Sequence, residues 1–246
     1  MGLAQGEDRG APGSGVTAWL ASITDAAEAR RVLTAGAAIV DAKNPHAGAL
    51  GALPHDTVRA IVVAMGGRVP VSATIGDFPE MNPAAVVAAV AAMATTGVDF
   101  VKIGLLPSPA LADCLDALVP LARRHRLVAV LFADREPDFK LIERLAERDF
   151  TGVMLDTADK AGGGLLAHQP VARLAQFVAQ AKGAGLLSGL AGSLKLADIP
   201  VLAPIGADYL GFRGALCRNH ARTWALDPDA LAALSEAMGR EAVQGA

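Results

Sequence analysis

Three lysines stand at or just past the ends of strand-like runs in this chain, and their positions point to chemistry. Lys43 closes the run at residues 38–43, Lys102 lies within the run at 100–105, and Lys160 follows the run at 152–157. An ammonium group is costly to place in a sheet core unless it is paired or chemically useful. Three such groups at comparable points of successive units predict one cationic pocket, which is typical of phosphate binding and lysine chemistry.

Two of these lysines are predicted to point inward. Lys43 follows Asp41 by two positions, so on a strand both side chains point the same way and predict an inward pair of opposite charge. A solvent-facing lysine at a strand end is the alternative interpretation. Lys102 is flanked by Val101 and Ile103, and it faces the interior if these two face the helices. An inward lysine is hard to explain by packing alone.

Crowded lysines have a chemical use. A neighbouring positive charge lowers the pKa of an ammonium group and exposes a nucleophilic amine. Such an amine forms a Schiff base with an aldehyde or ketone, and a second lysine or an aspartate then moves protons at carbon. Asp156 ends its run and is expected to face the site, with capping of the next segment as the alternative. Lys160 is a further candidate, with an ordinary loop lysine as its alternative. The pattern predicts aldol-type carbon–carbon bond formation.

Eight strand-like runs alternate with helical patterns and must position these residues. The runs occupy residues 17–22, 38–43, 69–76, 100–105, 127–133, 152–157, 186–191 and 209–213, and the helical stretches occupy 24–34, 55–65, 83–96, 109–124, 138–148, 169–184, 196–205 and about 227–239. Thr24 is the expected N-cap of the first helix, and Asp227-Pro228 sets the last one. A repeat in which a glycine ends a helix and a strand then ends in a polar residue occurs at 36–41, 97–102, 152–156 and 206–213.

These units predict an α/β fold, a single-domain (β/α)8 TIM barrel over residues 17–240, after a flexible extension at residues 1–16. A doubly wound open sheet is the alternative, and the lack of a G-x-G-x-x-G sequence after the first run weakens it. In a (β/α)8 barrel the active site lies at the carboxyl ends of the strands, where the candidate residues fall.

A phosphate site is predicted in two loops near the end of the chain. Gly192 and Ser193 follow the seventh run, and Arg213 and Gly214 follow the eighth. Loops after these strands often bind phosphate through backbone N–H groups at a helix start. Gly192 permits close approach, Ser193 donates and Arg213 clamps the anion. Ordinary loop glycines are the alternative interpretation.

Composition narrows the class of protein. The 246 residues are 52% hydrophobic and carry a net charge of -3, with no basic stripe that would bind nucleic acid. No apolar run is long enough to cross a bilayer, and the first residues do not resemble a secretory signal. Two widely separated cysteines fit a reducing, cytoplasmic compartment. The five histidines have no ligand spacing, so we expect no metal.

Six segments together resemble a known family. They are DAKNP at residues 41–45 with GALG at 48–51, SATIGD at 72–77, VKIGL at 101–105, MLDTA at 154–158 with Lys160, LAGS at 190–193 and GFRGALC at 211–217. In this order they resemble the (5-formylfuran-3-yl)methyl phosphate synthases of methanofuran biosynthesis, over roughly residues 17 to 236. The stretches at residues 131–136 and 218–223 depart from the family pattern, which puts a phosphate or lid contact in the second stretch in doubt.

The resemblance implies a class I aldolase-like barrel that condenses two molecules of glyceraldehyde 3-phosphate, with loss of phosphate and water, and needs no cofactor. It implies that Lys43 is the Schiff-base lysine and Lys102 the proton acceptor. Asp41, Asp156 and Lys160 match other polar positions of the family pocket. The expected partner is therefore a small triose phosphate, with neither nucleic acid nor membrane, and the oligomeric state, a homo-oligomer included, is left open.

Two rival functions remain at this point. Another class I aldolase, or an isomerase acting on a triose phosphate, would use the same barrel but form no furan. A non-catalytic phosphometabolite sensor would bind its ligand without turnover. The lysine set argues against the sensor, because binding alone needs no nucleophilic amine.

Overall fold

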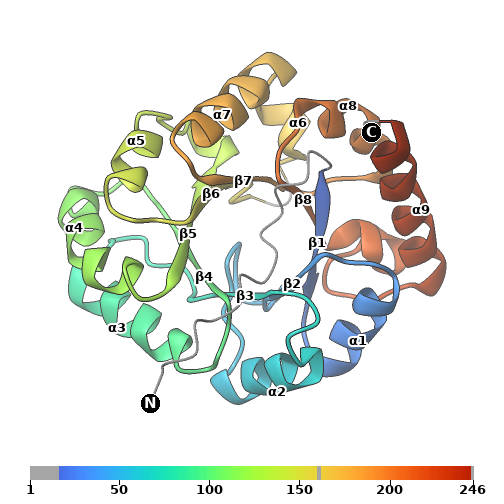
Figure 1. Cartoon of the computed structure of the whole chain (residues 1–246), viewed down its shortest axis with the longest axis horizontal. Coiled ribbons are helices and arrows are strands. Elements are labelled where there is room, and N and C mark those ends of the chain that lie inside the picture. Colours follow the sequence, from blue (N-terminus) through green and yellow to red (C-terminus); the bar gives the residue numbers. More distant parts are fainter. Residues whose placement is uncertain (1–16, 160–161, 245–246) are drawn as a thin grey trace, which may run out of the picture.

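Eight parallel strands close into a barrel in their order along the chain (Figure 1). The computed structural model describes residues 17–159 and 162–244, so the predicted extension at residues 1–16 lies outside the described residues. The strands are β1 (Ala18–Ile23), β2 (Ile39–Ala42), β3 (Val71–Thr74), β4 (Phe100–Gly104), β5 (Arg126–Phe132), β6 (Gly152–Asp156), β7 (Leu187–Leu190) and β8 (Tyr209–Phe212). The predicted (β/α)8 barrel is confirmed, and pairing of β1 with β8 rules out the open sheet.

Helices surround the barrel (Figure 1). The α-helices are α1 (Ala26–Thr34), α2 (His55–Met65), α3 (Pro83–Ala94), α4 (Leu111–Ala122), α5 (Leu141–Ala146), α6 (Leu165–His168), α7 (Val171–Gly183), α8 (Ile199–Leu202) and α9 (Pro228–Gln244). Short 3-10 turns are η1 (Ala133–Arg135), η2 (Leu196–Asp198), η3 (Ala203–Ile205), η4 (Gly214–Leu216) and η5 (Arg218–His220). Among the described residues, no helix combines the length and apolar character needed to span a bilayer.

Three local predictions were wrong. The helix expected at 196–205 is divided into η2, α8 and η3, because Pro200 and Pro204 cannot donate the backbone hydrogen bonds of a continuous helix. The N-cap of α1 is Asp25, not Thr24, since the Asp25 carboxylate accepts from the N–H groups of Ala27 and Glu28. Gly152 begins β6 rather than ending a helix.

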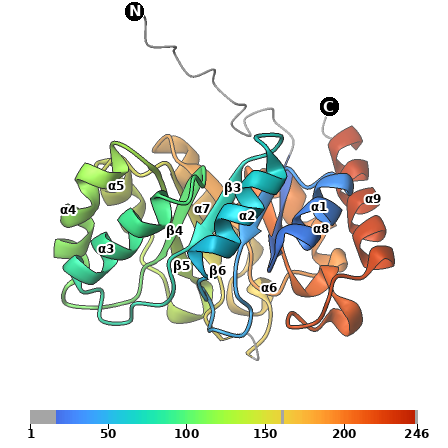
Figure 2. The ribbon, with the colours of Figure 1, turned by 90° about the horizontal axis from the view of Figure 1, so that it is seen from below.

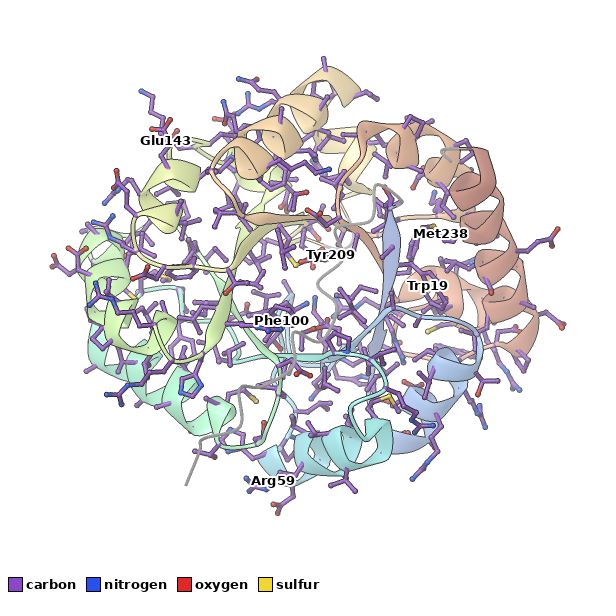
Figure 3. All side chains as sticks on the ribbon, in the orientation of Figure 1. Trp19, Arg59, Phe100, Glu143, Tyr209 and Met238 are labelled. Atoms are coloured by element: carbon purple, nitrogen blue, oxygen red, sulfur yellow. The ribbon has the colours of Figure 1, made fainter. Side chains whose placement is uncertain are left out.

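The alternation of side chains along each strand builds two separate apolar layers. Residues such as Val101 and Ile103 face the surrounding helices in the larger cluster. Phe100 and Tyr209 belong to the smaller cluster and lie inside the ring of strands (Figure 3). Because the side-chain period of a strand is two, the residues between the outward-facing ones must point into the barrel. This confirms the inward direction predicted for Lys102, which is buried.

Inward glycines make room for the aromatic side chains that fill the barrel. A Cβ at Gly189 would meet the ring of Tyr209, and one at Gly104 would lie 3.2 Å from the ring of Phe132. These apolar groups occupy the interior below the polar residues at the strand ends. The loops that follow β2, β6 and β8 lie along the lower edge of the barrel in Figure 2, at the carboxyl ends of the strands.

Candidate active site

A cavity of about 690 Å³ opens at the carboxyl ends of the strands. Eight of the nine predicted site residues line it: Asp41, Lys43, Lys102, Asp156, Gly192, Ser193, Arg213 and Gly214. The ninth, Lys160, lies outside the described residues. The expectation that distant lysines meet in one pocket is therefore met by Lys43 and Lys102, while the chemical role of each residue stays a prediction.

Lys102 and Asp41 form the deepest ion pair of this cavity. Lys102 Nζ lies 2.7 Å from Asp41 Oδ1, and the two side chains are only 3% and 1% exposed. The hydroxyl groups of Ser22 and Ser72 also donate to Asp41, at 2.9 and 2.6 Å. The strand register explains this cluster, because Asp41 on β2 is paired with Ser22 on β1 and with Ser72 on β3. Three donors thus hold one buried carboxylate in place.

Burial lowers the pKa of Lys102 below the ordinary lysine value. The attraction of Asp41 opposes this effect, and the positive charge of Lys43 adds to it. A lowered pKa increases the fraction of neutral amine near neutral pH. The neutral amine is the form of a lysine that accepts a proton.

Lys43 pairs with Asp156 across the barrel. Lys43 follows the last residue of β2, and its Nζ lies 3.0 Å from Asp156 Oδ2 at the end of β6. The inward pair predicted between Asp41 and Lys43 is not formed, because each has a partner on another strand. Side chains two positions apart on a strand run parallel to each other, whereas side chains from opposite strands converge. The Lys43 side chain retains 11% exposure, so it is the more accessible of the two amines.

The loop after β7 has a constrained backbone beside the cavity. Gly192 has a φ of 111°, and a Cβ there would lie 2.9 Å from Thr157 Cγ2. Ser193 also has a positive φ, 49°, and it is exposed. The Gly192 carbonyl accepts from Leu165 N–H at 2.9 Å, which joins this loop to the segment after β6. Glycine is thus required at 192 by a neighbouring side chain, in addition to any role in anion approach.

Asp134 holds the loop that follows β6. Its carboxylate accepts from the N–H groups of Ala158 and Asp159 at 2.8 and 2.7 Å. Burial raises the pKa of Asp134, but these backbone hydrogen bonds outweigh it and lower the pKa overall. The acidic turn after β5 therefore supports the loop that carries the end of the MLDTA motif.

Arg213 has a structural environment that sequence reasoning did not foresee. Its guanidinium pairs with Glu28 of α1, with Nη1 2.6 Å from Oε2 and Nη2 3.3 Å from Oε1. The carbonyl groups of Ser22, Arg222 and Trp224 accept its other hydrogen bonds. All five N–H groups of the Arg213 guanidinium therefore donate hydrogen bonds within the protein. A phosphate bound directly by Arg213, as the sequence predicted, would have to displace one of these acceptors.

Two further cations line the cavity and were missed from the sequence, namely Lys195 and Arg222. Lys195 lies just beyond the LAGS motif, and its adjacency to that motif was the signal that could have identified it. Arg222 belongs to the stretch at 218–223 that departs from the family pattern, and only the folding of η5 toward the mouth places it there. Within the described part of the chain, no group of three or more His, Cys, Asp or Glu side chains is arranged to hold a metal ion.

A family model and two related proteins point to the same family. Residues 19–235 match the family model described as 4-HFC-P synthase. A (5-formylfuran-3-yl)methyl phosphate synthase of Methanosarcina mazei is 36% identical over 194 residues, covering 74% of this chain and 82% of the relative. A Methylorubrum extorquens protein that bears the same name provisionally is 48% identical over 221 residues, covering 89% of this chain and 90% of the relative.

Solved structures agree in fold. Phosphoribosyl anthranilate isomerase from Thermus thermophilus superposes with a TM-score of 0.64 at 15% identity, covering 90% of this chain and 98% of that one. A 3-hexulose-6-phosphate synthase gives a TM-score of 0.61 at 19% identity, covering 89% and 99%. At these identities the likeness supports the barrel and carries no assignment of activity.

Proposed function

This chain belongs to the 4-HFC-P synthase family, and on that premise we propose that it condenses two molecules of glyceraldehyde 3-phosphate into (5-formylfuran-3-yl)methyl phosphate. The atoms balance with release of one phosphate and two water molecules. The observation that carries the proposal is the convergence of two amine–carboxylate pairs, Lys43 with Asp156 and Lys102 with Asp41, on one cavity. Schiff-base catalysis requires an amine nucleophile that its surroundings activate, and such pairs can provide it.

Lys43 is the proposed nucleophile. Its Nζ attacks the carbonyl carbon of the first triose phosphate, and loss of water from the carbinolamine gives an iminium. Asp156, 3.0 Å from Nζ, is placed to receive the proton that the amine must lose. The greater exposure of Lys43, compared with the 3% of Lys102, favours it as the residue that meets the carbonyl.

Lys102 is the proposed proton acceptor. As a neutral amine it removes a proton from the carbon next to the iminium, and the electron pair moves to nitrogen to give an enamine. Asp41 stabilises the ammonium group that forms, because it lies 2.7 Å away and is held by two hydroxyl groups. The enamine carbon then adds to the aldehyde of the second triose phosphate, whose oxygen takes up a proton.

Loss of phosphate and ring closure complete the furan. One phosphate leaves by elimination, water hydrolyses the iminium and frees the Lys43 amine, and a hydroxyl group closes on a carbonyl before loss of two water molecules makes the ring aromatic. We propose that Gly192, Ser193 and Gly214 hold a phosphate through the loops after β7 and β8, and that Lys160 contributes charge. Arg213 supports this site indirectly, because it holds the segment after β8 by donating hydrogen bonds to the carbonyl groups of Arg222 and Trp224. The proposed reaction runs in the cytoplasm on a small substrate and provides a precursor for a methanofuran-type cofactor.

Borohydride trapping tests the proposal. Incubation with glyceraldehyde 3-phosphate and borohydride should attach a reduced triose phosphate to Lys43 in the wild type, detected by peptide mass spectrometry. Lys43→Ala should lose both the adduct and the product. The furan product is detected by its near-ultraviolet absorbance. Lys182→Ala, at an exposed position of α7, is the matched control and should retain both.

Three other outcomes of this experiment would each contradict a different part of the proposal. An adduct that persists in Lys43→Ala would remove Lys43 from its role. A sugar phosphate in place of a furan would instead indicate another class I aldolase. Ligand-dependent stabilisation without any turnover would indicate a phosphometabolite sensor.

A further inference from the structure

The cavity contains more positive charge than its ion pairs neutralise. Among the residues that the structure describes, five cationic side chains line it: Lys43, Lys102, Lys195, Arg213 and Arg222. Three of them are paired, with Asp156, Asp41 and Glu28 respectively. Within residues 17–159 and 162–244, no carboxylate lies within ion-pair distance of the two others, Lys195 and Arg222. Unpaired cations that line a cavity are suited to bind an anionic ligand.

Arg222 is the more constrained of these two cations. Its side chain is half-buried, and its Nη2 donates to the Gly48 carbonyl at 2.9 Å. This is the one hydrogen bond that its guanidinium makes to the described residues, so four of its five N–H groups stay available. Burial lowers the pKa of Arg222, and the charge of Arg213 adds to this effect, while the more distant carboxylates of Asp156 and Asp77 oppose it. A phosphate would supply acceptors that the protein does not.

Arg213 and Glu28 fix the backbone that carries Arg222. Arg213 Nε donates to the Arg222 carbonyl at 2.9 Å, and Arg213 Nη2 donates to the Trp224 carbonyl at 3.1 Å. In the same segment Asn219 and His220 have positive φ values of 54° and 55°. Left-handed conformations at non-glycine residues are unfavourable and persist only where surrounding contacts impose them. The Arg213–Glu28 pair provides such contacts and directs this loop toward the mouth.

Arg222 and the predicted phosphate loop lie in different parts of the rim. Arg222 joins the segment after β8 to Gly48 in the segment after β2, whereas Gly192, Ser193 and Lys195 all follow β7. The reaction proposed above brings two phosphate groups into one cavity. Two anions that repel each other need separate binding groups.

We propose that Arg222 is a second phosphate anchor, which binds the phosphate of one triose phosphate while the loop after β7 binds the other. The Arg213–Glu28 pair acts as its positioning device. This inference rests on the proposed function for the identity of the ligands, but its binding chemistry, a fork of N–H groups on a phosphate monoester, is independent of turnover.

Calorimetric titration with glycerol 3-phosphate tests the anchor, because this compound carries the phosphate and lacks the carbonyl that a Schiff base requires. Arg222→Gln should weaken its binding by about tenfold or more, as expected for loss of a charge-assisted contact. Arg222→Lys, which keeps the charge, should recover part of the affinity. Arg59→Gln changes an arginine on the outer face of α2 (Figure 3) and should leave binding unchanged. Glycerol, without phosphate, should bind none of these proteins.

Two results would overturn the assignment of Arg222 as a phosphate anchor. Affinity of Arg222→Gln within twofold of the wild type would exclude the anchor, and so would a wild type that takes up no glycerol 3-phosphate at millimolar concentration. Glu28→Gln should weaken glycerol 3-phosphate binding while Arg222 is still present, which distinguishes positioning from direct contact. A wild type that forms no furan but loses affinity in Arg222→Gln would refute the proposed function and leave the anchor standing.

Discussion

Lys102 and Asp41 illustrate how one buried pair can serve both stability and chemistry. Each is almost fully buried, and each would be costly to leave alone in the barrel. The hydroxyl groups of Ser22 and Ser72 donate hydrogen bonds to Asp41, while burial disfavours the ammonium form of Lys102. The cluster therefore places a hydrogen-bonded carboxylate beside an amine whose pKa is lowered by burial.

Lys102→Met is expected to abolish most turnover. Removal of a general base typically costs about 100-fold or more in rate. It also leaves Asp41 without its cation, so unfolding in urea should show a loss of about 3–5 kcal/mol. The double variant Asp41→Asn/Lys102→Met removes both charges and should regain most stability without regaining activity. Full furan formation by Lys102→Met would refute its proton-transfer role.

The pH dependence of the reaction should report the same pair. Burial lowers the pKa of Lys102, and the neutral amine is the active form, so kcat/KM should fall as pH falls through that lowered pKa. Asp41 opposes the effect of burial, hence Asp41→Asn should lower the pKa further and move the acid limb to lower pH. Furan absorbance across a pH series measures this limb.

A substitution on the protein surface is the control for this pH series. Asp113→Asn, at an exposed position in the first turn of α4, removes a carboxylate of the same type and should leave the limb in place. A limb that moves to higher pH in Asp41→Asn would contradict the assignment of Lys102 as the titrating base.

At the scale of elements, the loop after β7 depends on glycine for two reasons. Gly192 adopts a φ of 111°, and Thr157 from the segment after β6 occupies the space that a side chain would need. The sequence pointed to Gly192 for anion approach, and packing between two loops is an additional constraint. This contact couples the predicted phosphate loop to the strand that carries Asp156.

Gly192→Ala is expected to destabilise the protein by about 1–3 kcal/mol, through both the positive φ and the contact with Thr157. It should also weaken binding of inorganic phosphate, because the loop must move. Gly183→Ala is the matched control, since it lies at the end of α7 with nothing within 4 Å, and it should be neutral or slightly stabilising. Urea unfolding measures both variants, and equal stability of the two would contradict this account.

The whole molecule is a closed ring whose polar end and apolar interior are separated along the strands. Tyr209 fills the interior over Gly189, and burial raises the pKa of its hydroxyl group. The polar groups lie toward the carboxyl ends of the strands. Closure through β1 and β8 brings Ser22 beside the end of β8, where Arg213 reaches both the Ser22 carbonyl and Glu28.

Much of this architecture could be predicted from sequence because its signals are local. The period-two alternation around Lys102, and the turns between units, depend on neighbouring residues alone. Eight strands and most helices were therefore placed within a few residues. Where prediction was wrong, as at Thr24 and at residues 196–205, a competing cap or a proline decided the outcome. The candidate residues converged because the barrel brings all strand ends to one mouth.

The sequence by itself determined the repeating strand–helix units, the inward direction of Lys102 and the family to which the motifs belong. Only the tertiary structure decided the partners. Lys43 meets Asp156 from 113 positions away, Arg213 is bound by Glu28 from 185 positions away, and Arg222 enters the cavity through a loop without a recognisable motif. The physical reason is that pairing of charges depends on distance in space, and closure of the barrel sets these distances without leaving a periodic signal in the chain.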